Sequence, residues 1–204
     1  MSDTKVPQKT DLKALTKSEL QDFCKELGLP RFRADQIFQW LYQKGVRSFD
    51  EMTNLSKDLR ARLDEVAFIS GLEVVSQQES KDGTIKFLFR LDDEGKDYKV
   101  EAVMIPDFYP DGVPKRLTVC VSSQVGCVFG CSFCATGKMG FFRNLTHGEV
   151  VDQVQYINSL TEQKYDKKIT NIVYMGMGEP LHNYKTVTTS AEIISDPLSI
   201  ELSP

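Results

Sequence analysis

The stretch Cys127-Val128-Phe129-Gly130-Cys131-Ser132-Phe133-Cys134 decides both the fold and the chemistry expected of this chain. Its three thiols follow the spacing C-x3-C-x2-C, at which thiolates can hold an iron–sulfur cluster. A four-iron cluster normally takes four cysteine ligands, so three would leave one iron without a protein ligand. An open coordination position is what separates a catalytic metal site from a structural one. The stretch therefore predicts a [4Fe–4S] cluster, held by Cys127, Cys131 and Cys134, that binds and reduces a small molecule.

The alternative is that the same cysteines bind a structural zinc ion. Zinc sites usually combine one C-x2-C pair with a second pair or with two histidines downstream. No second pair follows here, and Cys120, seven residues upstream, is an unusual place for a fourth ligand. His147 is better explained as the first residue of a helix than as a ligand, and His182 fits a polar loop residue as well as a residue that lines a pocket. The spacing therefore favours the cluster.

The composition is that of an ordinary globular protein. The 204 residues suffice for one or two domains, and they are 41% hydrophobic and 26% charged. No apolar run is long enough to span a membrane, and the start Met1-Ser2-Asp3-Thr4-Lys5 lacks the apolar core of a signal peptide. We therefore expect a cytoplasmic protein, in which cysteines stay reduced unless their chemistry is redox.

The charge is unevenly distributed along the chain. The net charge is −4, which argues against a generally basic nucleic-acid binder. From Lys115 to Gly148, however, there is no Asp or Glu, and the stretch carries Lys115, Arg116, Lys138 and Arg143. This cationic strip fits an anionic partner, and it equally fits a solvated basic loop beside a negatively charged cluster.

Residues 1–70 are expected to form a module of three helices. The first begins at the capping box Thr16-Lys17-Ser18-Glu19 and the third near Ser56. The apolar residues recur at helical spacing, which places them on buried faces: Leu20, Phe23, Cys24 and Leu27; Ala34, Ile37, Phe38 and Leu41; Leu59, Leu63 and Val66. We interpret Cys24 as a core residue and not as a ligand, because it lies on such a face.

From about Leu72 the hydrophobic period changes to two, which predicts strands. Two alternating sets, Ile85, Phe87, Phe89 and Leu91 and then Tyr98, Val100, Ala102 and Met104, flank the turn at 93–95. They predict an antiparallel hairpin, followed by a loop over Pro106–Pro114. Glu101 lies on the opposite face from the second set, and a strand carboxylate is most often solvated, so this pattern alone favours an edge position.

The remainder of the chain predicts a βα unit. A short β-prone run at Arg116–Val121 enters the cysteine stretch, and the capping box Thr146–Glu149 opens a helix. An apolar strand at Ile169–Met175 then ends in Gly176-Met177-Gly178-Glu179-Pro180, before a helix over Tyr184–Ile194. Such a unit implies a parallel sheet, in which function collects at the carboxyl ends of the strands.

Several of these stretches together resemble one enzyme family. The cysteine stretch resembles the radical S-adenosylmethionine signature C-x3-C-x-aromatic-C, and Gly178-Glu179-Pro180 resembles the turn that receives the methionine end of that cofactor. More narrowly, residues 33–41, 118–127, 140–145 and 175–180 resemble the RlmN-type methyltransferases, which act on carbon 2 (C2) of adenine in large-subunit ribosomal RNA and some transfer RNA. The resemblance covers nearly the whole chain.

This resemblance implies an α/β fold and a set of partners. The fold would be a radical S-adenosylmethionine partial (βα)6 barrel, of which 116–204 is the first part. A small helical, RNA-binding-like domain at 1–70 and a β-hairpin extension at 71–115 would precede it. The implied cofactors are a [4Fe–4S] cluster and S-adenosylmethionine, the implied partners are ribosomal and transfer RNA, and flavodoxin or ferredoxin would donate electrons to a monomeric full-length enzyme.

The resemblance also implies a mechanism. In the family, one S-adenosylmethionine methylates a cysteine near the C-terminus, and a second is cleaved at the open iron to a radical. That radical takes a hydrogen from the methylated cysteine, whose carbon then adds to adenine.

Site roles follow from the same resemblance. Cys120 matches the cysteine that attacks the methylated one and forms a disulfide with it, and the neighbouring cations Lys115 and Arg116 would favour its thiolate. Glu101 matches the general base, which reverses the solvated interpretation. Gly178 would bring backbone close to the cofactor, and Glu179 would accept a hydrogen bond from its ammonium group.

The chain departs from the family pattern in two respects. About one and a half βα units can be found where the family has six, and no cysteine follows Cys134. We therefore expect an N-terminal fragment that cannot methylate RNA alone and whose exposed strand edge lowers its solubility. A Cfr-like enzyme acting on C8 of adenine, a different radical enzyme such as a glycyl-radical activase, and a zinc-binding, RNA-binding module without catalysis remain alternatives.

Overall fold

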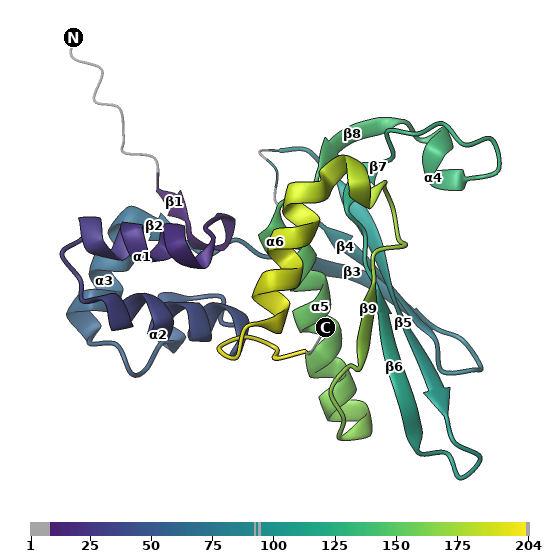
Figure 1. Cartoon of the computed structure of the whole chain (residues 1–204), viewed down its shortest axis with the longest axis horizontal. Coiled ribbons are helices and arrows are strands. Elements are labelled where there is room, and N and C mark those ends of the chain that lie inside the picture. The colour runs from purple at the N-terminus through teal and green to yellow at the C-terminus, as the bar shows by residue number, and fades with distance from the viewer. Residues whose placement is uncertain (1–8, 92, 94, 203–204) are drawn as a thin grey trace. The chain divides into compact units, whose positions relative to one another are not determined.

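The computed structural model of the chain describes residues 9–91, 93 and 95–202 (Figure 1). These residues divide into two compact units between Ser70 and Gly71. Each unit has its own set of buried apolar side chains. No helix in the described ranges combines the length and the apolar character that crossing a membrane requires.

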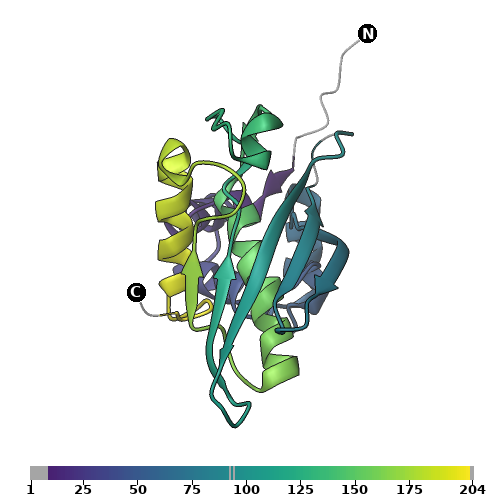
Figure 2. The same cartoon turned by 90° about the vertical axis from the view of Figure 1, so that its right-hand side faces the viewer.

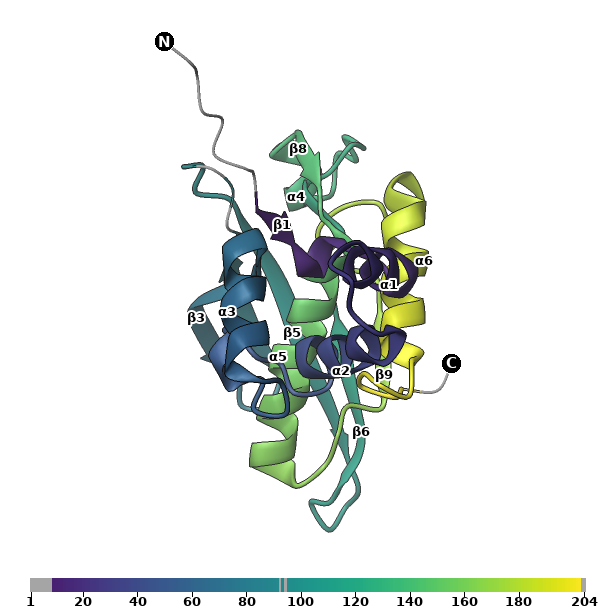
Figure 3. The same cartoon turned by 90° about the vertical axis from the view of Figure 1, so that its left-hand side faces the viewer.

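The first unit is mainly helical, with one short parallel strand pair (Figure 3). Its elements are β1 (Thr10–Asp11), η1 (Leu12–Ala14), α1 (Lys17–Glu26), α2 (Arg31–Tyr42), η2 (Phe49–Glu51), α3 (Lys57–Val66) and β2 (Ala67–Phe68). The three predicted helices are thereby confirmed.

The start of α1 shows why the sequence folds there. The Thr16 side chain accepts a hydrogen bond from the Glu19 backbone N–H, and the Glu19 carboxylate accepts one from the Thr16 N–H at 2.8 Å. The expected capping box is therefore present. Cys24 is completely buried on the inner face of this helix, as predicted, whereas Val66 at the end of α3 is only half-buried.

The second unit is an α/β unit built on one main sheet. Its elements are β3 (Glu73–Glu79), β4 (Ile85–Arg90), β5 (Lys99–Phe108), β6 (Pro114–Cys120), β7 (Gln124–Gly126), α4 (Ala135–Lys138), β8 (Phe141–Asn144), α5 (His147–Tyr165), β9 (Asn171–Val173), η3 (Pro180–Asn183) and α6 (Tyr184–Ser195). The strand order of the main sheet is β3-β4-β5-β6-β9, and β7 and β8 form a separate small hairpin.

The main sheet is mixed. Strands β3 to β6 pair antiparallel, whereas β6 and β9 pair parallel with Cys120 opposite Val173. The predicted hairpin and the predicted parallel pair are therefore both confirmed, and both belong to the same five-stranded sheet. Helices α5 and α6 lie on one face of it (Figure 1).

The two faces of the sheet differ in burial. Alternate residues of β4 to β6, including Phe87, Val100 and Val119, are completely buried. Phe87 and Phe89 contact the Tyr156 ring of α5 edge-on, at 5.7 and 5.6 Å between ring centroids, so the buried set faces the helices. The intervening residues lie on the opposite face of the sheet, which is turned toward the viewer in Figure 2. In the described part of the chain, no helix covers this face.

Three features of the sheet differ from the expectations. Strand β5 continues to Phe108 instead of ending before Pro106, because β6 pairs with it over that stretch. Strand β9 is shorter than Ile169–Met175, because the chain turns away after Val173. The hairpin of β7 and β8, which brackets the cysteine stretch, was not anticipated.

Candidate functional site

The cysteine stretch and the 176–180 turn lie at the same edge of the sheet. They follow β6 and β9, which run parallel, and the backbone ladder continues past both strands. The Val121 N–H donates to Val173 O at 3.0 Å, and the Ser123 N–H donates to Met177 O at 2.8 Å. The segment before the cysteines is therefore bonded directly to the turn.

The cysteine stretch forms a loop between β7 and α4. Cys127 N donates to Gly140 O at 3.0 Å, and Cys134 N donates to Cys131 O at 3.1 Å, so the loop is closed at its base and turned at its end. Cys131 is exposed, and the other two thiols are half-buried. Phe133, which is 91% exposed, stands beside them. The loop thus presents its ligand set at the surface.

The loop residues fit a cluster in two ways. A side chain at Gly137 would approach Phe129 O to 2.9 Å and Cys131 N to 3.1 Å, so α4 packs closely against the loop backbone. Hydrogen bonding from the Gly137 N–H lowers the pKa of Cys134, which favours the thiolate that binds metal. Among the described residues, no three His, Cys, Asp or Glu side chains converge on a single metal ion. A cube of four irons takes its cysteine thiolates on different irons and does not require such convergence.

The 176–180 turn packs against Gln124. Gly178 has a φ of +99°, and a Cβ there would lie 2.5 Å from Gln124 Cβ, so glycine is required by the turn itself. The Glu179 side chain accepts a hydrogen bond from Leu181 N at 3.0 Å and caps η3. The structure therefore shows Gly178 in close contact with Gln124. That the same glycine brings its backbone close to a cofactor stays a prediction.

Glu101 lies on the uncovered face of the sheet. It pairs in register with Leu88 on β4, and its carboxylate lies 3.0 Å from Lys86 Nζ. The Glu101 and Lys86 side chains are 44% and 46% exposed, so the carboxylate is half-solvated. The Ser122 hydroxyl donates to the Glu101 carbonyl at 2.5 Å, which ties this strand position to the segment that leads into the cysteine loop.

Cys120 lies on the same face as Glu101. Because Val103 is opposite Cys120, Glu101 and Cys120 are diagonal neighbours on adjacent strands, about 7–8 Å apart in ordinary sheet geometry. Their expected roles remain predictions, but the sheet brings the two side chains together.

The expectation that cations favour the Cys120 thiolate is wrong. Burial raises the pKa of the Cys120 thiol, and a hydrogen bond from the Met175 backbone only partly offsets it. Lys115 and Arg116 lie at the other end of β6, four or five residues away at about 3.3 Å per residue. They are too distant to lower the pKa of that thiol.

The cationic strip is partly neutralised. Arg143 donates to both carboxylate oxygens of Glu149, at 2.7 and 2.9 Å, and to Asp93 at 2.6 Å. The Lys115 Nζ lies 3.7 Å from an Asp107 carboxylate oxygen. At least two of the four cations therefore have protein partners, which weakens the case for a continuous anion-binding surface.

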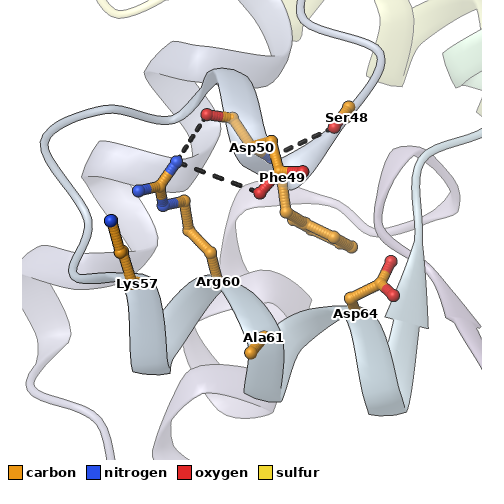
Figure 4. Close-up of a pocket in the computed structure, with 7 residues that line it drawn as sticks. All are labelled: Ser48, Phe49, Asp50, Lys57, Arg60, Ala61 and Asp64. Atoms are coloured by element: carbon orange, nitrogen blue, oxygen red, sulfur yellow. Dashed lines mark hydrogen bonds and ion pairs between the residues drawn. The ribbon is translucent and has the colours of Figure 1, made fainter.

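The first unit has a separate hollow of about 450 Å³ (Figure 4). Its lining residues are Ser48, Phe49, Asp50, Lys57, Arg60, Ala61 and Asp64. Arg60 Nη1 donates to Asp50 O at 2.6 Å and lies 4.0 Å from the Asp50 carboxylate. Because two carboxylates balance two cations here, the hollow is not a cationic phosphate site.

Two partners at the site were not anticipated from the sequence. Lys86 faces Glu101 across the hairpin, and Gln124 lies between the two loops. The register of the predicted hairpin would have identified Lys86. A glutamine inside a β-prone run just before the cysteines was the available signal for Gln124.

Comparison with known proteins places this arrangement in a class. The fold is similar to the crystal structure of a radical SAM methyltransferase from Sphaerobacter thermophilus, where SAM is S-adenosylmethionine. The TM-score is 0.81 and the identity 42%, over 95% of this chain and 54% of that one. The chain therefore shares its fold with about half of a radical SAM methyltransferase.

Sequence comparison finds similarity to a particular kind of RNA methyltransferase. Residues 10–69 match the ribosomal RNA large subunit methyltransferase N-terminal domain. The chain is 50% identical over 198 residues to the dual-specificity RNA methyltransferase RlmN of Nitratidesulfovibrio vulgaris, and 48% identical over 196 residues to that of Pelobacter propionicus. Each match covers 96% of this chain and about half of the relative, 53% and 52% respectively. The chain is thus similar to RlmN methyltransferases over nearly its whole length, and it spans about half the length of the curated relatives it matches.

Proposed function

We propose that this chain supplies the cluster-binding part of an RlmN-type methyltransferase. The reaction would be methylation of C2 of adenine in large-subunit ribosomal RNA and transfer RNA, through a methylated cysteine. The observation that carries the proposal is the 50% identity to an RlmN enzyme over 96% of this chain, which includes the three cysteines and the 176–180 turn. A partial (βα)6 barrel, begun by the parallel pair β6 and β9, remains part of this proposal.

Cys127, Cys131 and Cys134 would hold a [4Fe–4S] cluster on the loop between β7 and α4. When bound, the cluster and S-adenosylmethionine would supply the radical chemistry that an unreactive adenine carbon requires. Glu179 is suited to bind the ammonium group of the cofactor, because a carboxylate has two oxygens and only Oε1 is bonded to Leu181 N. Gly178 would present the backbone of the same turn.

Glu101 and Cys120 would serve the RNA on the uncovered face of the sheet. Glu101 would take the proton from C2 of adenine, and its half-exposed carboxylate can reach a base laid on this face. Cys120 would resolve the methylated cysteine as a nucleophile. Because burial favours its thiol form, it must lose a proton before it attacks.

The wider assignments follow from the same proposal. Residues 1–70 would be an accessory domain that contacts RNA, 71–115 an extension and 116–204 the first part of the barrel. The protein would act in the cytoplasm with an electron donor such as flavodoxin or ferredoxin, as a monomer in its full-length form. The 204-residue chain alone would be inactive, because no cysteine follows Cys134 to carry the methyl group.

Anaerobic reconstitution with iron and sulfide tests the proposal. The expected product is a brown protein with about four irons and four sulfides per chain, as a [4Fe–4S] cluster requires. Cys127→Ala, Cys131→Ala and Cys134→Ala should each abolish it, whereas Cys24→Ala, which changes a core thiol, should not. A colourless protein with a single zinc would overturn the assignment in favour of a zinc-binding module.

A further inference from the structure

Gln124 is a buried side chain whose hydrogen-bonding capacity is completely used. It is 0% exposed. Its Oε1 accepts from Val128 N at 3.3 Å and from Glu179 N at 2.9 Å. Its Nε2 donates to Asn144 Oδ1 at 2.8 Å and lies 3.2 Å from His182 Nδ1. A side-chain amide offers two donors and one oxygen with two lone pairs, so every position is occupied.

The four partners of Gln124 belong to four different segments. Val128 lies in the cysteine loop, Glu179 in the 176–180 turn, Asn144 at the end of β8 and His182 in η3. The backbone nitrogens of Val128 and Glu179 are both within 3.3 Å of a single oxygen atom. The Gln124 side chain therefore fixes the separation between Val128 and Glu179.

Steric contact reinforces this bond network. The space that a side chain at Gly178 would fill is occupied by the Gln124 Cβ and Cγ, at 2.5 and 2.6 Å. The turn thus rests on the stem of Gln124 while its head group bonds to Glu179. Since close-packed interiors transmit small displacements, a shift of Gln124 would move both loops.

We propose that Gln124 is a positioning residue, which holds the cysteine loop and the 176–180 turn at the separation that a cluster and the amino-acid end of S-adenosylmethionine require. The inference rests on the proposed function for the identity of those two groups. The fixed separation itself rests only on the residues described. Among the residues described, no other side chain hydrogen-bonds to both loops.

Amide hydrogen exchange on the 204-residue chain tests the fixed separation. In Gln124→Met, exchange at Val128 and Glu179 should accelerate together by about fivefold, as expected when a hydrogen bond worth about 1 kcal/mol is lost. Gln124→Glu keeps an acceptor oxygen for both N–H groups and should leave both amides protected. If Gln124→Met does not fold, Gln124→Asn is the substitute variant, because it shortens the side chain by one methylene and keeps the amide group.

Gln153→Met is the matched control. Gln153 is also 0% exposed, and it bonds to both backbone groups of Ser122 and to Glu149 O, but to neither loop. Its replacement should lower stability without selectively releasing Val128 and Glu179. Equal release of both amides in Gln153→Met, or release of only one of them in Gln124→Met, would overturn the proposal.

A second readout separates this inference from the proposed function. After reconstitution, the electron paramagnetic resonance spectrum of the reduced cluster should shift on addition of S-adenosylmethionine in the parent and in Gln124→Glu. The shift should be lost in Gln124→Met at unchanged iron content. A parent chain without iron would contradict the proposed function, while the exchange data would still decide the role of Gln124.

Discussion

Two thiols outside the cysteine loop have a pKa raised by burial. In the first unit, burial raises the pKa of Cys24 from 9.0 to about 11. The pKa of Cys120 is raised for the same reason. A cysteine reacts as its thiolate, and at pH 8 a pKa of about 11 leaves roughly one Cys24 in a thousand ionised, against about one in ten at 9.0. The Cys24 thiol is therefore both inaccessible to reagents in solvent and weakly nucleophilic.

We predict that Cys24 resists alkylation in the folded, cluster-free chain. At pH 8, iodoacetamide should modify Cys24 at least about a hundredfold more slowly than the exposed Cys131, as peptide mass spectrometry can measure. Unfolding in urea should remove the difference. Because the folded pKa is the higher one, the stabilisation linked to Cys24 is present below pH 9 and lost as the pH rises through about 11. Similar native rates for the two thiols would contradict the burial of Cys24.

The ion pair of Lys86 and Glu101 should contribute little to stability. Both side chains are nearly half exposed, and such surface pairs are worth about 0–1 kcal/mol. We predict that Lys86→Met lowers the free energy of unfolding by less than about 1 kcal/mol in urea titrations. Arg143→Met is the contrasting variant, because it leaves the largely buried carboxylates of Glu149 and Asp93 without their cation. It should cost about 2 kcal/mol or more, and equal losses in the two variants would be inconsistent with this account.

Local capping decides where individual helices begin. The boxes at Thr16–Glu19 and Thr146–Glu149 are both formed, and α1 and α5 each start at the residue directly after the capping threonine. We predict that Thr16→Ala destabilises the first unit by about 1 kcal/mol, because the cap bond to Glu19 N is lost. Thr53→Ala, at an exposed threonine outside any helix cap, should change stability by less than about 0.5 kcal/mol. A Thr16→Ala variant as stable as the parent in thermal melts would show that packing alone fixes this helix.

The helices and strands that could be predicted are those whose signals come from residues close together in the sequence. Capping residues and helical spacing lie within a few positions of one another, so α1, α2 and α5 were predictable. The strand β3 is exposed along most of its length and has no alternation to read. Pro106 looked like a strand terminator, but β5 has only β6 as a partner there, and an edge stretch tolerates a missing N–H.

The candidate site was predictable to a similar extent. The cysteine spacing and the 176–180 turn are local signals, and the parallel pairing of β6 with β9 brought them to one edge as expected. Lys86 could have been found from the register of the predicted hairpin. Gln124 bonds to Glu179, 55 residues away, and its only signal in the sequence was a polar residue inside a β-prone run. The pKa of Cys120 depends on how deeply the strand is buried, which charge counting along the chain does not reveal.

At the scale of the whole molecule, the second unit has an open strand edge. Among the described strands, β9 pairs only with β6, so one side of it offers unpaired backbone groups. We predict that the chain associates with itself as its concentration rises, as sedimentation velocity can measure. Val173→Lys, which adds a charge on this edge, should reduce the association. A parent chain that remains monomeric at all concentrations would contradict the prediction.

The first unit has a core of its own, which suggests that it folds without the rest of the chain. Its completely buried side chains include Leu12, Ile37, Leu41 and Leu63. We predict that a polypeptide of residues 9–70 unfolds cooperatively, with a stability of only about 3–5 kcal/mol because its core is small. Leu41→Ala should cost about 2–5 kcal/mol and remove most of that stability. Phe32→Ala, at a side chain that is 52% exposed, should leave the melting transition of the helical circular dichroism signal nearly unchanged. A gradual, non-cooperative melt of the parent polypeptide would show that this core requires the second unit.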